Sequence, residues 1–315
     1  MSDDRFDCRR RRLLIGTGGL LLAAAGASLA DLAAAAAPSA QGASAAPSAS
    51  SAQDDAARVV VIGGALAEIV YALGRADSLV GADTTCTYPQ QAQALPKVGY
   101  QRALSAEGLL SLRPTLILAS AEAGPPSVLQ RVADAGVKLA SFGEGHDVAS
   151  VREKIVGVAR ALDAENAGQT LLARFDRAWA ETSARVAAAP KPTPEPRVLF
   201  LMSPAGNQPM VAGQHTAADA MLAYAGARNA MQGFSGYRAL TPEALVAAQP
   251  DIVLTTDDAL KAAGSKRHLL DSAGFALTPA GRSTRVVALD ALFLLGFGPR
   301  LPEAVSALNR SLAKA

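Results

Sequence analysis

The sequence has little of what several protein classes need. Its 315 residues include two cysteines and three histidines, and these show no metal-ligand spacing. A zinc site is therefore not expected. No basic stripe interleaved with aromatic residues appears, so nothing points to a nucleic-acid partner. The P-loop, the GxGxxG turn and the nucleophile elbow are absent from the sequence, which removes the usual signals for nucleotide binding and acyl transfer.

Long apolar runs are scarce too, apart from one near the N-terminus. Residues 9–12 are four arginines, and a short apolar run rich in glycine and alanine covers residues 13–29. A basic segment, a short apolar core and small residues beyond it predict a signal peptide over residues 1–37. The run makes a poor membrane span, although an N-terminal anchor helix remains the alternative. We therefore expect a periplasmic protein.

The export route stays open at this point. The paired arginines allow twin-arginine export as well as the general route, because the adjacent arginines precede an apolar core. Cys8 lies in the predicted signal peptide, and no cysteine follows the apolar run as a lipid-attachment site. The mature protein would keep only Cys86, which cannot form an internal disulfide. We expect a soluble protein rather than a lipid-anchored one.

Residues 38–57 consist mainly of alanine, serine, proline and glutamine, which cannot build a core. This segment is predicted to be a disordered tether. The remaining chain of about 260 residues is long enough for two modest lobes with substantial cores. The full sequence of 315 residues has a net charge of +2 and a hydrophobic content of 50%, which are ordinary values for a soluble globular protein.

Two blocks of the chain alternate short apolar runs with helical segments, which predicts βα units around buried, mostly parallel sheets. We assign residues 58–146 to an N-terminal α/β lobe and residues 197–315 to a C-terminal α/β lobe. The runs expected to form strands are residues 59–62, 79–82, 116–119, 137–140, 198–201, 252–254 and 286–289.

A long helical stretch, residues 147–190, lies between these blocks. Apolar residues recur along it at spacings of three and four, which is typical of an amphipathic helix. Forty residues of helix would span about 60 Å, although a break near residues 163–168 is compatible with the pattern. The proline-rich residues 191–196 then predict a stiff linker. We expect a single long backbone helix to join the two lobes.

An internal echo supports two lobes of like construction. Residues 104–118 align without gaps with residues 240–254. In both segments a serine or threonine opens a short helix, a proline ends it and an apolar strand follows. One unit used once in each lobe predicts two lobes that face each other.

At four further segments the sequence resembles the periplasmic haem-binding proteins of bacterial ABC haem importers. These segments are residues 61–74, 84–89, 95–100 and 236–241. The wider class, which includes cobalamin- and siderophore-binding proteins, shares the first segment and the repeated helix that contains glutamate. The Tyr-Pro and Gly-Tyr-Arg sequences narrow the resemblance to the haem-binding proteins of this class. It implies a fold of class III periplasmic binding proteins, in which two α/β lobes are joined by one long backbone helix.

The resemblance also implies a function. It predicts a monomeric carrier, not an enzyme, that binds haem in the cleft between the lobes. The carrier would deliver haem to an inner-membrane ABC permease and its ATPase, with an outer-membrane haem receptor as a source. Alternatives that stay open are a cobalamin or ferric-siderophore carrier of the same class and an exported haem-modifying enzyme.

Tyr88 is the first candidate for the site. It follows the expected strand 79–82 in a polar loop, and Pro89 favours an extended conformation there. Loops at the carboxyl ends of strands are where open α/β sheets bind ligands. Tyrosine binds haem iron as a phenolate. Because a free tyrosine has a pKa of about 10, ionisation at neutral pH needs the ferric charge and a cationic neighbour.

The resemblance supplies the other cleft residues. It places Arg238 on the opposite lobe, where the guanidinium would contact the Tyr88 phenolate or a haem propionate. Tyr100 and Tyr237 would stack on the porphyrin or close the cleft, and ordinary packing at the edge of the cleft stays open as the alternative for each. Cys86 and His215 stay open as alternative or second iron ligands, although a bystander thiol and a surface or helix-capping histidine are the simpler interpretations.

Glu107 and Glu243 occupy equivalent positions in the echoed helices. A carboxylate in the first helical turn gains about 0.3–1 kcal/mol from the helix dipole, which is reason enough for a glutamate there. The resemblance implies more, namely that each lobe's glutamate docks onto arginines of the permease. Exposed ion pairs are individually weak, which suits transient docking.

Overall fold

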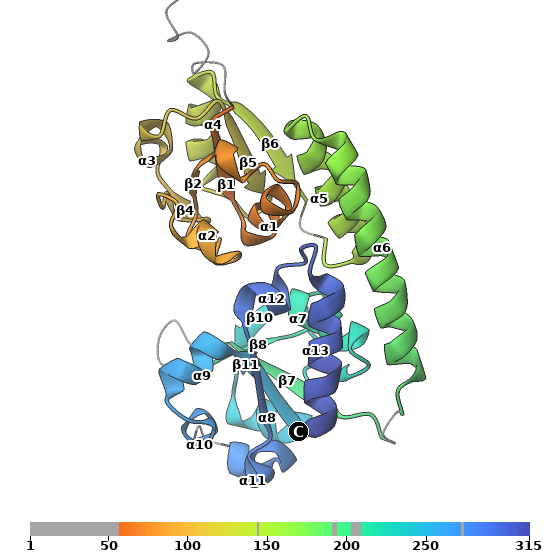
Figure 1. Ribbon diagram of the computed structural model, residues 1–315. Helices are drawn as coiled ribbons and strands as arrows, with labels where there is room; N and C mark the ends of the chain where they lie inside the picture. The colour runs from red at the N-terminus through yellow and green to blue at the C-terminus, as the bar shows by residue number, and fades with distance from the viewer. Residues whose placement is uncertain (1–56, 144, 191–193, 203–208, 272–273) are drawn as a thin grey trace, which may run out of the picture. The chain divides into compact units, whose positions relative to one another are not determined.

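The computed structural model describes residues 57–143, 145–190, 194–202, 209–271 and 274–315. The predicted signal peptide and nearly all of the predicted tether lie outside these residues. The described residues all belong to one compact unit, residues 50–315. Two separate sheets with helices around them account for most of it (Figure 1).

The N-terminal lobe contains a four-stranded sheet of order β2-β1-β5-β6 in which each neighbouring pair is parallel. A small antiparallel hairpin, β3-β4, lies outside this sheet. The elements of the lobe are β1 (Val59–Ile62), α1 (Gly64–Ala72), η1 (Ala76–Ser78), β2 (Leu79–Ala82), α2 (Gln90–Gln93), β3 (Gly99–Tyr100), β4 (Ala103–Leu104), α3 (Ala106–Ser111), β5 (Leu116–Ser120), α4 (Pro126–Asp134) and β6 (Lys138–Phe142).

The C-terminal lobe contains a six-stranded sheet with the path β10-β8-β7-β11-β12, and β9 pairs with β7. Its β7, β9, β11 and β12 pair in parallel, whereas β8 and β10 are antiparallel. The elements are β7 (Arg197–Met202), β8 (Met210–Ala212), α7 (Ala217–Tyr224), β9 (Arg228–Asn229), β10 (Tyr237–Ala239), α8 (Pro242–Ala248), β11 (Ile252–Thr256), α9 (Asp257–Ala263), α10 (Lys266–Leu269), η2 (Phe275–Leu277), α11 (Pro279–Ser283), β12 (Val286–Leu289), α12 (Ala291–Leu295) and α13 (Leu301–Lys314).

The two sheets repeat one arrangement. In the first, β5 lies between β1 and β6; in the second, β11 lies between β7 and β12. The echoed segments of the sequence form the helix and central strand of each unit, α3 with β5 and α8 with β11. The expected two lobes of mostly parallel sheet are therefore confirmed.

The predicted helical stretch 147–190 is two helices, α5 (Val148–Ala161) and α6 (Glu165–Ala188). Asp163 adopts a φ of 48°, which interrupts the helical hydrogen bonds. Gly168 then lets α6 approach α5, because a Cβ there would lie 2.4 Å from the Cβ of Ala159. The connecting helix is thus α6 alone, 24 residues or about 36 Å long, instead of the expected 60 Å.

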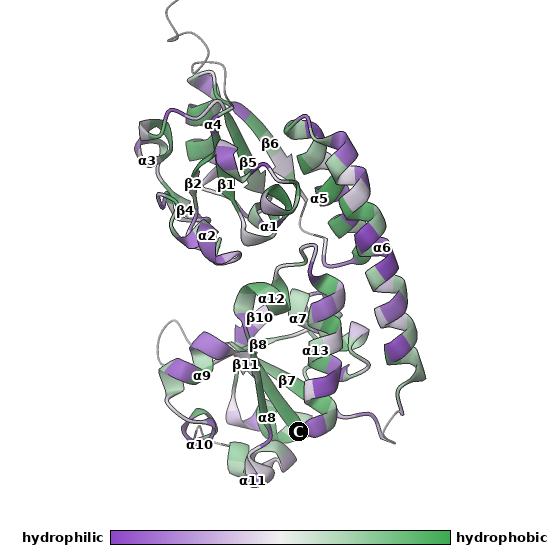
Figure 2. Ribbon diagram, in the orientation of Figure 1, coloured by the Kyte–Doolittle hydropathy of each residue, from purple (hydrophilic) through white to green (hydrophobic). Residues whose placement is uncertain are grey.

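The helix α6 packs against α5 on one side of the connection and against α13 on the other (Figure 1). The central strands β1, β5, β7 and β11 are hydrophobic, whereas α6 carries many hydrophilic residues (Figure 2). One hydrophobic cluster runs without interruption from the first sheet, through α5 and α6, into the second. Alternate strand residues face this cluster, and the intervening ones form a separate cluster in each lobe. The two lobes therefore share part of their core.

Phe175 tests the importance of this shared core. Its side chain lies within the shared cluster and is 2% exposed. We expect Phe175→Ala to lower the free energy of unfolding by about 3–5 kcal/mol, because it removes a buried aromatic ring and leaves a cavity. Urea unfolding measures this change. The exposed Arg174 on the same helix is the control, since Arg174→Ala should change stability by less than about 0.5 kcal/mol. Equal effects of the two substitutions would contradict the shared core.

Candidate functional site

The loop that follows β2 presents Tyr88, and a buried carboxylate shapes this loop. Asp83 is fully buried. Its Oδ1 accepts a hydrogen bond of 2.8 Å from the backbone N–H of Gly63, and its Oδ2 accepts one of 2.8 Å from that of Thr85. The Thr85 hydroxyl donates to Oδ1 at 3.0 Å. Asp83 therefore ties the loop to the turn between β1 and α1.

Two further side chains hold the same loop from its other end. The Gln93 amide donates to the carbonyl of Thr87 at 2.7 Å. The Lys97 ammonium donates to the carbonyls of Ala92 at 2.9 Å and Cys86 at 3.3 Å. The backbone around Tyr88 is thus fixed by hydrogen bonds on both sides. Its ring remains 45% exposed and available for contact with a ligand.

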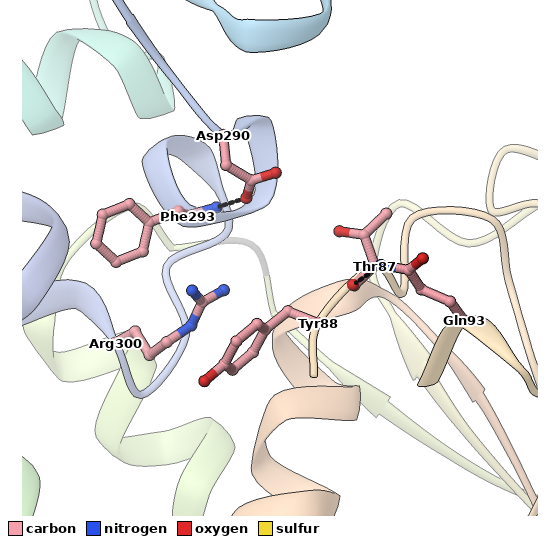
Figure 3. A pocket seen from close by; sticks show the side chains of 6 residues that line it. All are labelled: Thr87, Tyr88, Gln93, Asp290, Phe293 and Arg300. Carbon is pink, nitrogen blue, oxygen red and sulfur yellow. Dashed lines mark hydrogen bonds between the residues drawn. The ribbon is translucent and has the colours of Figure 1, made fainter. Parts of the chain in front are cut away.

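The ring of Tyr88 lies against Arg300, which comes from the other end of the chain. The Cζ atom of Arg300 is 3.6 Å from the centroid of the Tyr88 ring and 5.0 Å from that of Phe293. Figure 3 shows the guanidinium between the two rings. A cation over an aromatic face is attracted by the ring quadrupole. This places a permanent positive charge beside the predicted iron ligand.

Arg300 is held in place by Glu68 of α1. Its Nε donates to Oε2 of Glu68 at 2.9 Å, and a terminal nitrogen donates to Oε1 at 2.5 Å. The Glu68 side chain is 4% exposed. Burial raises the pKa of Glu68, and the hydrogen bonds and charge of Arg300 oppose this rise. Burial alone would lower the pKa of Arg300, but Glu68 raises it, so the guanidinium stays charged.

These residues border a cavity of about 320 Å³ that opens to solvent. Its lining comes from both lobes: Thr87, Tyr88, Gln93, Asp290, Phe293 and Arg300 (Figure 3). The Asp290 side chain accepts from the backbone N–H of Phe293 at 2.8 Å, which caps α12. A phenol, a guanidinium and an aromatic ring in one place suit a flat ligand that carries a metal centre.

Tyr100 and Tyr237 are not among the residues that line this cavity. Tyr100 is at the tip of the β3-β4 hairpin, and Arg102 of the same hairpin pairs with Glu122. Burial raises the pKa of Tyr237 in β10, and Glu122 adds to the rise while Arg102 opposes it. The C-terminal lobe's Tyr237 therefore lies close enough to these N-terminal side chains to sense their charge. Both tyrosines are nearly half exposed, at 45% and 40%.

Arg238 was predicted as the cationic partner of Tyr88, and the structure places Arg300 there instead. The Cζ atom of Arg238 lies 3.8 Å from the centroid of the Phe234 ring, and the residue is exposed. Sequence reasoning missed Arg300 because it follows a glycine-rich turn without periodicity, and its partner Glu68 is 232 residues away. A role for Arg238 at a haem propionate stays a prediction.

The two alternative iron ligands both have structural roles. Cys86 is fully buried, and its Sγ lies 3.1 Å from Oδ1 of Asp83. His215 adopts a φ of 58°. Its backbone N–H donates to the Asp219 carboxylate at 3.0 Å, and its ring nitrogen lies 3.0 Å from the Ser235 hydroxyl. These contacts support the simpler interpretation of each residue.

Glu107 and Glu243 occupy the first turns of α3 and α8 and are exposed. The Ser105 hydroxyl accepts from the backbone N–H of Gly108 at 3.0 Å, and that of Thr241 accepts from Ala244 at 3.2 Å. The two helix starts are thus capped alike, as the sequence predicted. Equivalent carboxylates stand on the two lobes, outside the cavity lining.

Neither a metal cluster nor a membrane helix is found in the described part of the chain. Within it, no group of three or more histidine, cysteine, aspartate or glutamate side chains could hold a metal ion. Among the helices of the same residues, none is long and apolar enough to cross a membrane.

Comparisons with known proteins give consistent findings. The family model described as "Periplasmic binding protein" matches residues 59–292. The solved structure of the periplasmic heme-binding protein BhuT in complex with two hemes is 61% identical, covers 82% of this chain and 98% of that chain, and has a TM-score of 0.77. The apo form of the periplasmic heme-binding protein RhuT from Roseiflexus sp. RS-1 is 40% identical, with the same coverage and a TM-score of 0.78.

The chain is also similar to a substrate-binding lipoprotein of an ABC transporter. An uncharacterized ABC transporter substrate-binding lipoprotein, YvrC of Bacillus subtilis (strain 168), is 28% identical over 247 residues. The alignment covers 78% of this chain and 76% of YvrC.

The thiol of Cys86 provides a test of the loop geometry. Burial, the charge of Asp83 and its hydrogen bond to Sγ raise the pKa of Cys86 far above its ordinary value. Because the thiolate is the reactive form, we expect alkylation in the folded protein to be at least about a hundredfold slower than after denaturation. Iodoacetamide labelling of a Cys8→Ser variant, followed by mass spectrometry, measures both rates. Fast labelling of the folded protein would contradict the buried Asp83–Cys86 contact.

Proposed function

We propose, because the chain belongs to the periplasmic binding protein family, that it carries haem and binds it with Tyr88 as the iron ligand. The observation that carries this proposal is the stacking of Tyr88 on Arg300, an arginine paired with the buried carboxylate of Glu68, at a cavity lined by both lobes. The similarity to haem-binding proteins such as BhuT and RhuT over 82% of the chain supports the same cargo.

The residues present suit haem as a transported ligand. The phenolate of Tyr88 binds ferric iron, and the Arg300 guanidinium lies against the same ring. Aromatic and apolar groups around the porphyrin supply most of the contact area in such a site. Phe293 is one, and Tyr100 and Tyr237 stack on the porphyrin or close over it. Arg238 binds a propionate at the rim.

Cobalamin or a ferric siderophore is the alternative cargo. A carrier of either cargo would have the same fold and the same docking surface. Only the residues of the ligand site therefore distinguish these cargoes from haem. An iron-ligating tyrosine with a stacked arginine favours haem, because haem iron has an open axial position. We also infer that the chain is a carrier and not an enzyme, since the family and the similar structures are binding proteins.

The proposal extends to the route and the partners. A signal peptide over residues 1–37 exports the chain to the periplasm, by the twin-arginine or the general route. The tether of residues 38–57 precedes the folded part. The carrier acts as a monomer, takes haem that enters through an outer-membrane receptor, and delivers it to an inner-membrane ABC permease with its ATPase. Its relative YvrC is named as a substrate-binding protein of such a transporter.

Glu107 and Glu243 form the docking surface for the permease. They stand in the first turns of equivalent helices, one on each lobe, and neither has an ion-pair partner among the described residues. Two carboxylates on like surfaces suit a permease with two like subunits that present arginines. The attraction would steer and orient the complex more than it would tighten it.

Substitution of Tyr88 tests the cargo and the ligand together. We expect hemin to bind the wild type saturably with a high-spin ferric spectrum of the tyrosinate type. Tyr88→Phe should lose this spectrum and bind at least about a hundredfold more weakly, which is about 2.7 kcal/mol, because it keeps the ring and removes only the ligating oxygen. A visible-spectrum titration of both proteins measures this. The number of haems bound per chain comes from the same titration.

The outcomes separate the candidates clearly. Cyanocobalamin and a ferric siderophore, titrated in parallel, should not compete with hemin. An absence of saturable hemin binding would transfer the proposal to one of those cargoes. Unchanged hemin binding by Tyr88→Phe would move the iron ligand to another residue. Conversion of bound haem during the titration would show an enzyme.

The docking surface is tested by removing its charge. We expect the double variant Glu107→Gln, Glu243→Gln to bind the detergent-solubilised permease about tenfold more weakly, because each exposed pair is worth up to about 1 kcal/mol. Its affinity for hemin should not change. The control is Glu165→Gln, which removes an exposed carboxylate from the first turn of α6. Equal permease affinity for all three proteins would rule out the proposed docking surface.

A further inference from the structure

The pair formed by Glu68 and Arg300 has a position that protein stability alone does not explain. Arg300 is the residue that precedes the first turn of α13. A cation at a helix N-terminus is disfavoured by the helix dipole, and a serine or aspartate is the usual residue there. The buried Glu68 carboxylate offsets this cost. A pair of neutral side chains, however, would avoid the cost of removing a carboxylate and a guanidinium from water. Fold stability therefore does not explain why residue 300 is charged.

The surroundings of the pair are built for close contact between α1 and the segment before α13. A Cβ on Gly298 would lie 3.3 Å from Oε2 of Glu68 and 3.4 Å from the Cα of Ala65. A Cβ on Gly64 would lie 2.5 Å from a methyl group of Leu292. Glycines at these two positions let the backbones approach, which brings Arg300 within reach of Glu68.

The held guanidinium covers one face of the Tyr88 ring. Arg300 uses Nε and one terminal nitrogen on Glu68, so its plane is fixed by two hydrogen bonds. Phe293 lies beyond it, with its ring centroid 5.0 Å from Cζ. The ring of Tyr88 is thus stacked on a rigid, charged platform, while its edge remains open to the cavity (Figure 3).

We propose that Arg300, anchored by Glu68, is the positioning residue that orients Tyr88 for haem ligation and sets the electrostatic environment of the bound iron. This inference rests on the proposed function. Arg300 acts through Tyr88 and does not itself bind iron. Its fixed charge, close to the phenolate, favours the iron site with the lower total positive charge, which is the ferrous one.

The test is a neutral replacement of the pair, Glu68→Gln with Arg300→Gln, which keeps polar side chains of similar size and removes both charges. We expect haem transfer from this variant to apomyoglobin to be at least about tenfold faster than from the wild type, because the cation–π contact is lost. The midpoint potential of the bound haem should become more negative.

The matched control is Arg197→Gln with Asp251→Asn. This pair is also held by two side-chain contacts, each of 3.2 Å, but lies outside the cavity lining. We expect its haem transfer rate and midpoint potential to equal those of the wild type. A general effect of losing an ion pair would appear in both double variants and would overturn the proposal.

Arg300→Lys provides a second test if the neutral pair fails to fold. Lysine keeps the charge but lacks the planar fork, so it cannot hold the same stacked geometry. We expect a midpoint potential close to that of the wild type together with faster haem transfer. A wild-type transfer rate in this variant would overturn the positioning role.

The result for Tyr88→Phe separates this inference from the proposed function. If Tyr88→Phe keeps the wild-type spectrum, Tyr88 is not the ligand and both proposals fall. If Tyr88→Phe loses the spectrum and the neutral pair keeps the wild-type transfer rate and potential, only the role of Arg300 is overturned.

Discussion

A buried carboxylate without a partner is costly, and in this protein Glu68 is such a carboxylate unless Arg300 reaches it. Among the described residues, Glu68 belongs to the first helix and Arg300 immediately precedes the last. Their pairing requires contact between the start of the N-terminal lobe and the end of the C-terminal one. The same arginine lies against Tyr88, so the Glu68–Arg300 pair also determines the position of the side chain proposed to bind iron.

The shared hydrophobic core stabilises the contact between the two lobes. One hydrophobic cluster joins the two sheets through α5, α6 and α13. The edge-on contact of Trp179 in α6 with Tyr224 in α7, at 5.0 Å between ring centroids, belongs to the same layer. Large hinge bending would expose this layer to water. The lobes are therefore suited to holding a ligand between fixed walls.

Sequence reasoning succeeded where local physics determines the outcome. Strands β1, β2 and β12 have the expected bounds, because each is a short apolar run buried in a parallel sheet. The echoed helix starts followed from their capping residues. Strands β8 and β10 were missed, since each has three residues and they form an antiparallel edge with exposed residues such as Arg238. Arg300 could not be found locally, because its role depends on a partner distant in the chain.

The central claim is that Tyr88, stacked on Arg300, is the group that binds the iron of haem. A crystal structure of the protein with bound haem tests this most directly. We predict that the Tyr88 oxygen is bonded to iron, that Arg300 still pairs with Glu68 beside the Tyr88 ring, and that the two lobes have hardly moved. Iron held by another residue, with Tyr88 turned away from the porphyrin, would contradict the account.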